Sequence, residues 1–226
     1  MEMCGKFTQM MAWAELVDLA ELIGVPVRET DVIMVTPVRD AFIIRRGPAG
    51  ARQSARMRWG FIPGWARNPM TAKPHFHARA EEIETKRTFA DSFFARRGIL
   101  VARDFSVGED VTSTKRIQHR ITPRDGKPIA MAVIWDSWRE PHGGALLTFA
   151  MITVPANKLI GAVTDRMPAI LQPADWTKWL GEEQADVDVL KALLKPFEGD
   201  WDMQAQTKKA KAAKKPAPED DSPMLF

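Results

Sequence analysis

Cys4 is the only cysteine in this chain of 226 residues, and it follows Met3 close to the N-terminus. If translation starts at Met3, or if residues 1–3 are removed, Cys4 becomes the first residue and carries a thiol and a free α-amine on adjacent carbons. Part of any α-amine population is unprotonated at neutral pH, and a nearby cation favours the thiolate form of cysteine. Such a residue can condense with an aldehyde through its amine and then close a ring through its sulfur. The ordinary alternative is an incidental cysteine in a frayed terminus.

Four stretches of the sequence are more specific than packing alone requires. Taken singly, each has an ordinary explanation, because Trp and Phe beside Gly and Pro are usually buried and an exposed pair such as Arg79 and Glu81 contributes little to stability. Their order along the chain is the stronger signal. The stretches are Cys4-Gly5-Lys6-Phe7, then Arg58-Trp59-Gly60-Phe61-Ile62-Pro63-Gly64-Trp65, then His77-Ala78-Arg79-Ala80-Glu81, and residues 153–171 with Ala156-Asn157, Thr164-Asp165-Arg166-Met167-Pro168 and Ile170-Leu171.

In this order the stretches resemble the SOS response-associated peptidase family, whose pattern is Met-Cys-Gly-Arg-Phe at the N-terminus, then WGLIPxW, NARAE, DGFYEW, TTxAN and HxRMPxIL. The resemblance covers about Met3 to Leu180. It implies a largely antiparallel, barrel-like curved sheet with flanking helices and a positively charged cleft. It also implies an activity, which is to bind abasic sites in single-stranded DNA or at junctions and to link an N-terminal cysteine to the ring-opened sugar as a thiazolidine. The aldehyde chemistry open to Cys4 agrees with this activity.

The resemblance also implies roles for single residues. The cationic Lys6 and Arg79 match positions that contact phosphates around the lesion, and such contacts make affinity salt-dependent. Trp59 and Trp65, with Phe61, would form a wall on which unstacked bases rest, a contact of about 1–3 kcal/mol per base. The other members of the predicted DNA-binding set are Thr153, which falls beside the family cysteine, Pro37, which lines the same pocket, and Arg166 of the last motif.

The sequence departs from the family pattern in the reactive centre. Thr164 stands where the family has a histidine and cannot act as a general acid or base at neutral pH, while His77 replaces an asparagine and Lys6 an arginine. The family glutamate falls on Val107 in a gap-free count. Glu109 lies two residues further, on the same face of a strand, and a small bulge could bring it into that role. The predicted catalytic set is Cys4, His77, Glu109 and Thr164.

These departures affect the expected steps differently. Condensation with an aldehyde needs mainly proximity and orientation, worth about 7–11 kcal/mol in well-aligned cases, so we expect crosslinking to survive. Each lost proton shuttle would slow the acid–base steps by roughly 10²–10⁴ unless His77 compensates, and His77 can equally be a neutral hydrogen-bonding replacement for asparagine. Two alternatives follow. One is a non-catalytic paralogue that binds single-stranded or damaged DNA, and the other is a peptidase, a hydrolase as the family name denotes, that acts on its own Met1-Glu2-Met3 leader.

The order of the predicted elements favours one α+β domain over residues 1–201. Apolar spacing and turn residues predict a helix at 10–23, a hairpin-like pair of strands at 31–35 and 41–45, and a loop at 47–54. A helix is expected at 88–97 with Phe89, Phe93 and Phe94 facing inward. Further strands are expected at 99–105, 116–121, 129–135 and 146–154, and helices at 156–163, 174–180 and 187–194. Residues 202–226, rich in Lys, Ala and Pro and then acidic, predict a disordered tail.

Composition restricts the partners and the location. A single cysteine excludes an intrachain disulfide and favours a reducing cytoplasm, and no apolar run is long enough for a membrane span. A net charge of +3 permits DNA binding without requiring it. We expect a cytoplasmic, nucleoid-associated monomer without a cofactor, and no metal, because four scattered histidines make no convincing ligand set; these are His75, His77, His119 and His142. The C-terminal Met224-Leu225-Phe226 faintly resembles a peptide that binds a bacterial sliding clamp.

Overall fold

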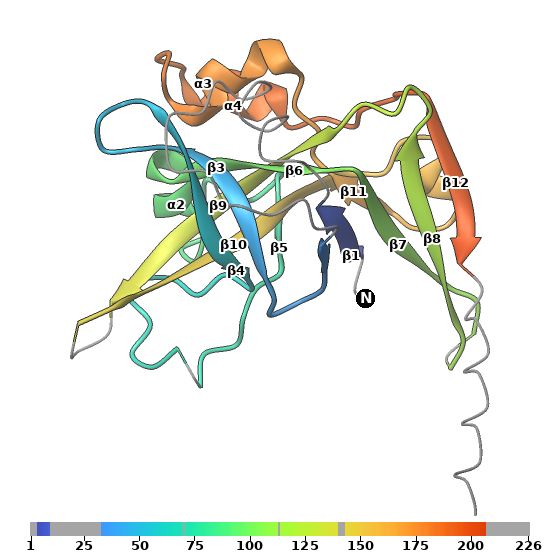
Figure 1. Ribbon diagram of the computed structural model, residues 1–226, viewed down its shortest axis with the longest axis horizontal. Helices are drawn as coiled ribbons and strands as arrows, with labels where there is room; N and C mark the ends of the chain where they lie inside the picture. The colour runs from blue at the N-terminus through green and yellow to red at the C-terminus, as the bar shows by residue number, and fades with distance from the viewer. Residues whose placement is uncertain (1–3, 10–32, 70, 113, 140–142, 207–226) are drawn as a thin grey trace, which may run out of the picture.

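The computed structural model describes residues 4–9, 33–69, 71–112, 114–139 and 143–206 (Figure 1). Strands dominate over helices. The strands are β1 (Cys4–Gln9), β2 (Ile33–Val35), β3 (Asp40–Arg46), β4 (Arg52–Trp59), β5 (His77–Arg79), β6 (Arg97–Ala102), β7 (Asp104–Asp110), β8 (Arg116–Pro123), β9 (Ile129–Arg139), β10 (Ala145–Pro155), β11 (Arg166–Pro168) and β12 (Trp201–Gln206). The helical segments are α2 (Ala90–Ala95), α3 (Trp176–Leu180) and α4 (Val187–Leu193), with the 3-10 turns η1 (Ile160–Ala162) and η2 (Pro173–Asp175).

Five of these strands close into a barrel. β3 pairs antiparallel with β4 and β6, β6 pairs with β9, and β9 pairs with β10. The ring closes where β10 pairs in parallel with β4, with Phe149 opposite Trp59. The short strands β5 and β11 pair with β10 as well. Ile43, Leu100 and Val133 are fully buried in this barrel, whose interior is filled by side chains, as in other small barrels.

A second sheet lies beside the barrel, in the strand order β12-β8-β7-β1-β2. All of its pairs are antiparallel, and β1 is an interior strand between β7 and β2. Phe7 of β1 packs against Trp59 of the barrel, with 5.2 Å between ring centroids. The Gln9 side chain donates to the Phe42 carbonyl and accepts from the Phe42 N–H, both at 2.9 Å. These contacts give the two sheets one shared core, and the predicted barrel-like α+β fold is confirmed.

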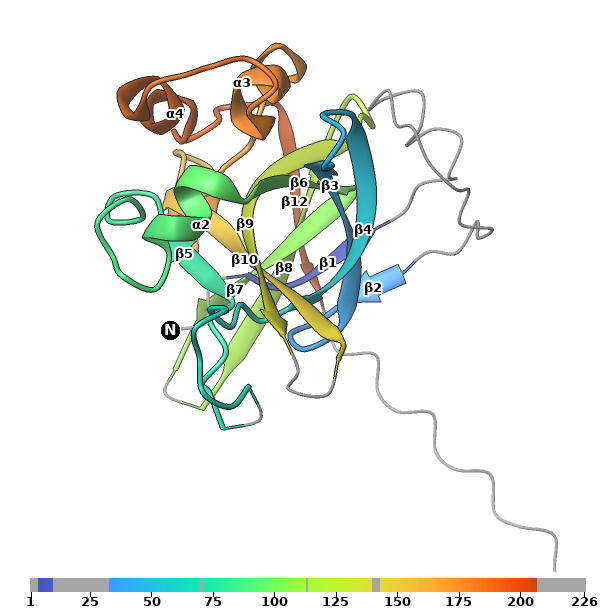
Figure 2. The ribbon, with the colours of Figure 1, turned by 90° about the vertical axis from the view of Figure 1, so that its left-hand side faces the viewer.

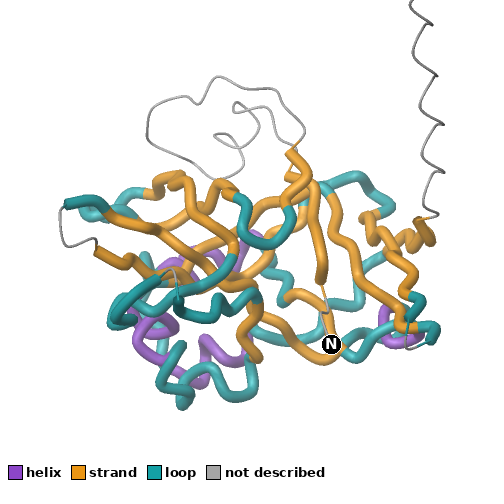
Figure 3. Tube along the Cα trace, turned by 90° about the horizontal axis from the view of Figure 1, so that it is seen from below, coloured by secondary structure: helices purple, strands orange, loops and turns teal. Residues whose placement is uncertain are grey.

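The helices lie at the margins of the strands. In Figures 1 and 2, α3 and α4 lie together over one end of the barrel. Seen from below, strands run through most of the molecule, and helices lie to one side of them (Figure 3). Trp179 of α3 is fully buried and donates its indole N–H to the Gly98 carbonyl of β6 at 2.8 Å. This tryptophan fixes the helical layer to the barrel.

The chain crosses between the two sheets at two points that the sequence pattern does not reveal. Residues 31–35 and 41–45 are not a hairpin, because β2 pairs with β1 whereas β3 pairs with β4 and β6. Val38, in the turn between them, has a φ of 62°, and its N–H bonds to the Trp59 carbonyl at 2.9 Å, which directs the chain into the barrel. The predicted strand 99–105 divides at Arg103, whose N–H donates to the Thr8 carbonyl at 2.9 Å. The two halves, β6 and β7, therefore belong to different sheets.

Three local predictions are wrong. The predicted loop 47–54 ends at residue 51, because residues 52–54 already pair with β3 as the start of strand β4. Residues 156–163 form only the 3-10 turn η1 in place of the predicted helix, and the Asn157 side-chain oxygen accepts from the Ile160 N–H at 2.9 Å where this turn begins. Phe94 is 50% exposed, since Phe89 and Phe93, one helical turn apart, occupy the buried face of α2.

The remaining predicted elements agree with the structure within a few residues at their ends. The strands at 116–121, 129–135 and 146–154 and the helices at 174–180 and 187–194 are confirmed. The domain boundary at 202 falls inside β12, which pairs with β8 from Trp201 to Gln206. The side chains of β12 are largely polar, so the sequence shows no apolar pattern that predicts a strand there. Its backbone nevertheless pairs with β8 as the last strand of the second sheet. The helix predicted at 10–23, the tail from residue 207 and the Met224-Leu225-Phe226 motif lie outside the described residues.

Candidate functional site

Strand β1 places the backbone of Cys4 in the second sheet, where Cys4 pairs with β7 while β2 pairs only with residues 7–9. The register pairs Cys4 with Val107 of β7 and Lys6 with Ser106, so Gly5 is the extra residue of a bulge between them. Because β1 and β7 are antiparallel, the N-terminal end of β1 lies beside the C-terminal end of β7. Strand β7 continues past Val107 to Asp110. The backbone of Cys4 therefore lies next to the part of β7 that carries Glu109.

Glu109 and His119 form a pair beside this strand end. The β7–β8 register sets His119 opposite Val107, and its Nε2 lies 2.7 Å from Glu109 Oε2. The His119 side chain is 12% exposed and that of Glu109 is 36% exposed. In the sequence, His119 stands out only as one of four histidines. Its position beside Glu109 depends on the register of β7 and β8, for which no motif gives a signal.

His77 lies on the barrel side of the site, on β5. Its ring meets that of Trp59 edge to face with centroids 5.8 Å apart, and Trp59 contacts Phe7 of β1. Ring contacts thus run from β5 to the strand that begins with Cys4. In the β5–β10 pairing, His77 lies opposite Met151.

Arg166 of β11 is bonded to β10 and to the turn that follows β5. It is 7% exposed and donates from Nη2 to the Thr153 carbonyl and to Glu81 Oε2, both at 2.7 Å, while Nη1 bonds to the other Glu81 oxygen. Such a two-point contact fixes both direction and plane. Arg79, opposite Thr153 in the β5–β10 pairing, is exposed. These contacts hold the cluster together, and Arg166 would have to give them up to bind DNA, so its DNA-binding role stays a prediction.

The charge of this cluster is set mainly by Arg166. Its hydrogen bonds hold the pKa of Glu81 below the usual range, partial burial acts in the opposite direction, and Arg79 adds a smaller lowering. Lys191 of α4 donates to the Ala80 carbonyl at 2.9 Å, which ties the turn after β5 to a helix. The segment that follows Arg79 is therefore fixed from two sides.

The other predicted residues flank these two groups. Thr164 is half-buried two residues before β11, and its N–H donates to the Ile160 carbonyl at 3.1 Å. Pro37 and Lys6 are half-buried, in the turn after β2 and on β1. The second sheet thus carries Cys4, Lys6, Glu109 and His119, whereas β5, β10 and β11 carry His77, Arg79, Thr153 and Arg166.

The aromatic residues predicted to form a base-stacking wall differ in exposure. Trp59 and Phe61 are fully buried, and Trp59 stacks on Phe149 with centroids 6.5 Å apart. A stacking role for these two is wrong, because an enclosed ring has no free face for a base. Trp65 is 56% exposed, and the guanidinium of Arg87 lies 5.3 Å from its ring centroid. For Trp65 the stacking role stays a prediction.

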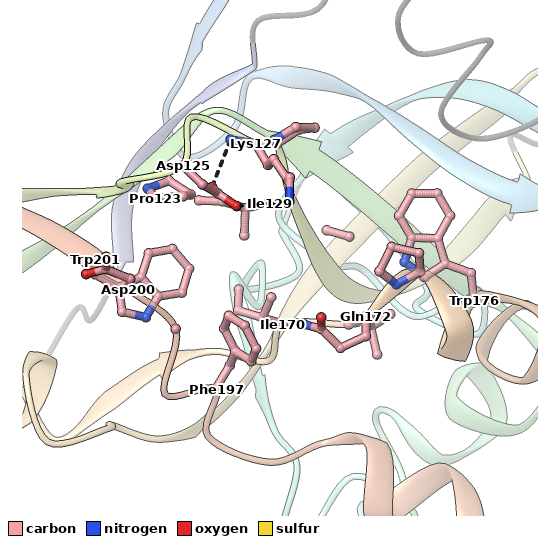
Figure 4. A pocket seen from close by; sticks show the side chains of 15 residues that line it. Pro123, Asp125, Lys127, Ile129, Ile170, Gln172, Trp176, Phe197, Asp200 and Trp201 are labelled. Carbon is pink, nitrogen blue, oxygen red and sulfur yellow. Dashed lines mark hydrogen bonds and ion pairs between the residues drawn. The ribbon is translucent and has the colours of Figure 1, made fainter.

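A cavity of about 360 Å³ lies apart from these residues (Figure 4). Its walls come from the β8–β9 turn and from the segments 170–176 and 197–201. Asp125 and Lys127 stand at one wall, with Lys127 Nζ 3.4 Å from Asp125 Oδ2. None of the predicted catalytic or DNA-binding residues lines this cavity, so it is separate from the candidate site.

Two further features are absent from the part of the chain that the structure describes, a cluster of metal-ligating side chains and a long apolar helix. Within these ranges, no three His, Cys, Asp or Glu residues gather in a way that could hold a metal ion. The same residues include no helix long and apolar enough to cross a membrane. The α-helix α4, for example, has 7 residues.

Comparison with known proteins decides the family. The model of the family described as SOS response associated peptidase (SRAP) matches residues 3–211. The chain belongs to the SRAP family. YoqW of Bacillus subtilis is 30% identical to this SRAP chain over 208 residues, which are 90% of this chain and 91% of the relative. HMCES of Xenopus tropicalis is 31% identical over 170 residues, 65% of this chain and 50% of the relative. Both relatives are named abasic site processing proteins.

Solved structures agree on the SRAP fold. A protein from Bordetella bronchiseptica aligns with a TM-score of 0.76 at 22% identity and covers 90% of this chain and 100% of its own. A protein from Bacteroides thetaiotaomicron aligns with a TM-score of 0.75 at 22% identity, covering 89% and 92%. The overall fold is therefore shared with experimental structures.

Proposed function

We propose that this SRAP protein processes abasic sites in single-stranded DNA and that Cys4, once N-terminal, links itself to the ring-opened sugar. The observation that carries the proposal is the register of β1, in which Cys4 begins an interior strand next to the β7–β8 strands that bear Glu109 and His119. The names of the relatives support the substrate class. The family description supports a role in the response to DNA damage.

The proposed reaction joins one aldehyde carbon to two atoms of Cys4. The α-amine attacks the aldehyde carbon, and water leaves with the carbonyl oxygen and both amine protons to give an imine. The thiol then adds across the C=N bond, with sulfur bonding to carbon and the thiol proton going to nitrogen. The atoms balance with the loss of one water, and no electrons are exchanged. Orientation of the two partners supplies most of the acceleration.

The covalent step is tested with protein that starts at Cys4, prepared by cleaving a leader and checked by intact mass. This protein is mixed with an oligonucleotide that contains one abasic site and analysed on a denaturing gel. We expect a shifted band, which disappears with Cys4→Ala and with protein that retains residues 1–3. Absence of the band with a confirmed N-terminal cysteine would overturn the proposal. The same mass measurement shows whether the protein removes its own leader, as the peptidase alternative requires.

DNA contacts are proposed for Arg79, Lys6 and Trp65. Their contribution is measured by fluorescence anisotropy with an oligonucleotide that carries a tetrahydrofuran abasic analogue, which has no aldehyde. Arg79→Ala and Lys6→Ala should each lower the salt dependence of binding by about 0.7 in slope per lost phosphate contact. Trp65→Ala should lower affinity by about 1–3 kcal/mol if one base stacks on it. Unchanged affinity and slope in all three variants would remove this surface from the proposal.

A non-catalytic DNA-binding protein is the second candidate, and Thr164 is the observation that favours it. A threonine hydroxyl does not exchange protons readily at neutral pH, unlike the histidine that the family pattern has there. Under this alternative, Cys4→Ala leaves binding unchanged and no adduct forms with either protein. The gel and the anisotropy experiment together separate the two candidates.

A further inference from the structure

We propose that His119 is the positioning residue for Glu109, and that this pair handles the protons of the Cys4 reaction in place of the histidine missing at position 164. The inference rests on the proposed function. His119 lies outside the family motifs, and it would take over the proton transfer that the motif residue Thr164 cannot perform.

The first argument is the direction of the strands. Cys4 lies opposite Val107, and β1 and β7 are antiparallel, so the backbone nitrogen of Cys4 faces the side of β7 on which Glu109 follows. Two residues along a strand correspond to about 7 Å. If Cys4 is the first residue, β1 supplies no partner for residues 108–110, and the α-amine is the group nearest to Glu109 along this edge. The carboxylate thus stands on the side where the reacting amine would be.

The second argument is the unequal burial of the pair. His119 is 12% exposed while Glu109 is 36% exposed, with 2.7 Å between Nε2 and Oε2. The enclosed imidazole is held by the sheet, whereas the carboxylate is the part open to a ligand. A hydrogen bond to an ionised group is short and directional. His119 therefore restricts the orientation of Glu109 and can exchange a proton with it.

The third argument is that, among the residues that the structure describes, those directly opposite His119 carry no charge. On the strands paired with β8, Val107 of β7 and Ala205 of β12 lie directly opposite His119, and neither has a polar side chain. Two other ion pairs join β7 and β8, Arg116 with Asp110 at 3.4 Å and Arg120 with Asp104 at 3.6 Å. Their residues have the opposite alternation along both strands, so both pairs lie on the other face of the sheet. Glu109 is thus the charged partner that the sheet presents to His119.

The chemistry needs a group that first removes a proton and later returns one. Attack by the amine releases a proton, departure of water requires a proton on oxygen, and the thiol proton finally moves to nitrogen. Glu109 paired with His119 can accept the first proton and deliver the second, so the pair ends in the state in which it began. No proton is created or lost beyond those of the overall condensation.

The test compares the rate of adduct formation for protein beginning at Cys4 with the rates for His119→Ala, Glu109→Gln and the double variant. We expect each single variant to slow the reaction by on the order of 100-fold, and the double variant to be no slower than the slower single one. Affinity for the tetrahydrofuran analogue should stay unchanged. Added imidazole should restore part of the rate to His119→Ala and none to Glu109→Gln.

A matched control and a conservative variant keep the result interpretable. Asp110→Asn removes the neighbouring β7–β8 ion pair and should react at the wild-type rate. His119→Gln retains hydrogen-bonding capacity without proton exchange, so it should react slowly even if His119→Ala fails to fold. A wild-type rate in folded His119→Gln or His119→Ala would overturn the role of His119 and leave the proposed function intact. Loss of the adduct in the wild-type protein would overturn both.

Discussion

The barrel side and the sheet side of the proposed site are held together in different ways. On the barrel side, the nearly buried Arg166 bonds to Thr153 of β10 and to Glu81 in the turn after β5. These three residues lie in stretches that resemble family motifs. On the sheet side, Cys4 begins a strand at a bulge, and Glu109 meets His119 across two strands. The family pattern has no counterpart for His119. Sequence motifs thus identified Arg166, which holds neighbouring segments together. The Glu109–His119 pair depends on the register of β7 and β8, so only the structure reveals it.

The largest effect is expected from removing the Trp59 ring, which contacts Phe7 on the sheet side and His77 on the barrel side. Trp59→Ala should lower the free energy of unfolding by about 3–5 kcal/mol, because Trp59 is fully buried and its loss leaves a cavity. Urea unfolding followed by circular dichroism measures the effect. The control is Trp65→Ala, which is 56% exposed and should change stability by less than about 0.5 kcal/mol. Equal effects would mean that Trp59 does not join the two sheets.

The barrel-side anchor can be removed by itself. Arg166→Met should cost about 3 kcal/mol of unfolding free energy, because it leaves the Thr153 carbonyl and Glu81 without their buried donor. Denaturant unfolding again provides the measurement. Arg79→Met, on the exposed strand position beside it, is the matched variant and should be nearly neutral. A neutral Arg166→Met would show that the cluster contributes nothing to the fold.

A histidine at position 164, on the barrel side, should partly replace His119 of the sheet side. Thr164→His restores the family residue, and in the His119→Ala background it should raise the rate of adduct formation about tenfold, equivalent to about 1.4 kcal/mol. The same substitution in the wild-type protein should have a smaller effect, because the Glu109–His119 pair already acts there. The rates come from quenched time courses on denaturing gels. If the gain is the same in both backgrounds, the two histidines do not substitute for one another.

The smallest expected effect is a pH dependence of stability on the barrel side. Arg166 lowers the pKa of Glu81 in the folded protein, so the folded state binds this proton less readily than the unfolded chain. The stabilisation is complete above the ordinary glutamate range, near pH 4.3, and is lost as the pH falls through the lowered value. Unfolding of the wild type and of Glu81→Gln between pH 3 and pH 6 measures it. The variant should show the shallower slope, by an amount reduced through solvent screening, since the Glu81 side chain is 50% exposed.

Local sequence pattern predicted the strands with continuous apolar runs and failed where the partner decides the structure. The runs at 129–135 and 146–154 become β9 and β10, because buried strands of a barrel are apolar on nearly every residue. The division at Arg103 is invisible in the sequence, since Ala102 and Asp104 continue as strand in different sheets. Likewise, β12 is recognisable only by its pairing with β8.

The candidate site divides in the same way. Order and spacing of motifs identified Cys4, Arg79, Thr153 and Arg166, and the structure sets the last three on neighbouring strands. Residue type alone could not distinguish the buried Trp59 from the exposed Trp65, because both lie in one aromatic, glycine-rich stretch. His119 could not be predicted, since its relation to Glu109 arises from the β7–β8 register.

The interior position of β1 has a consequence for the order of events during synthesis. Cys4 is translated early, but its strand partner Val107 follows about 100 residues later, which takes roughly 5–20 s at usual elongation rates. Only β2 can pair with β1 during that interval. If Cys4 becomes N-terminal while the chain is still on the ribosome, as the proposed function allows, β7 and β8 join the sheet only after β1 already begins at Cys4.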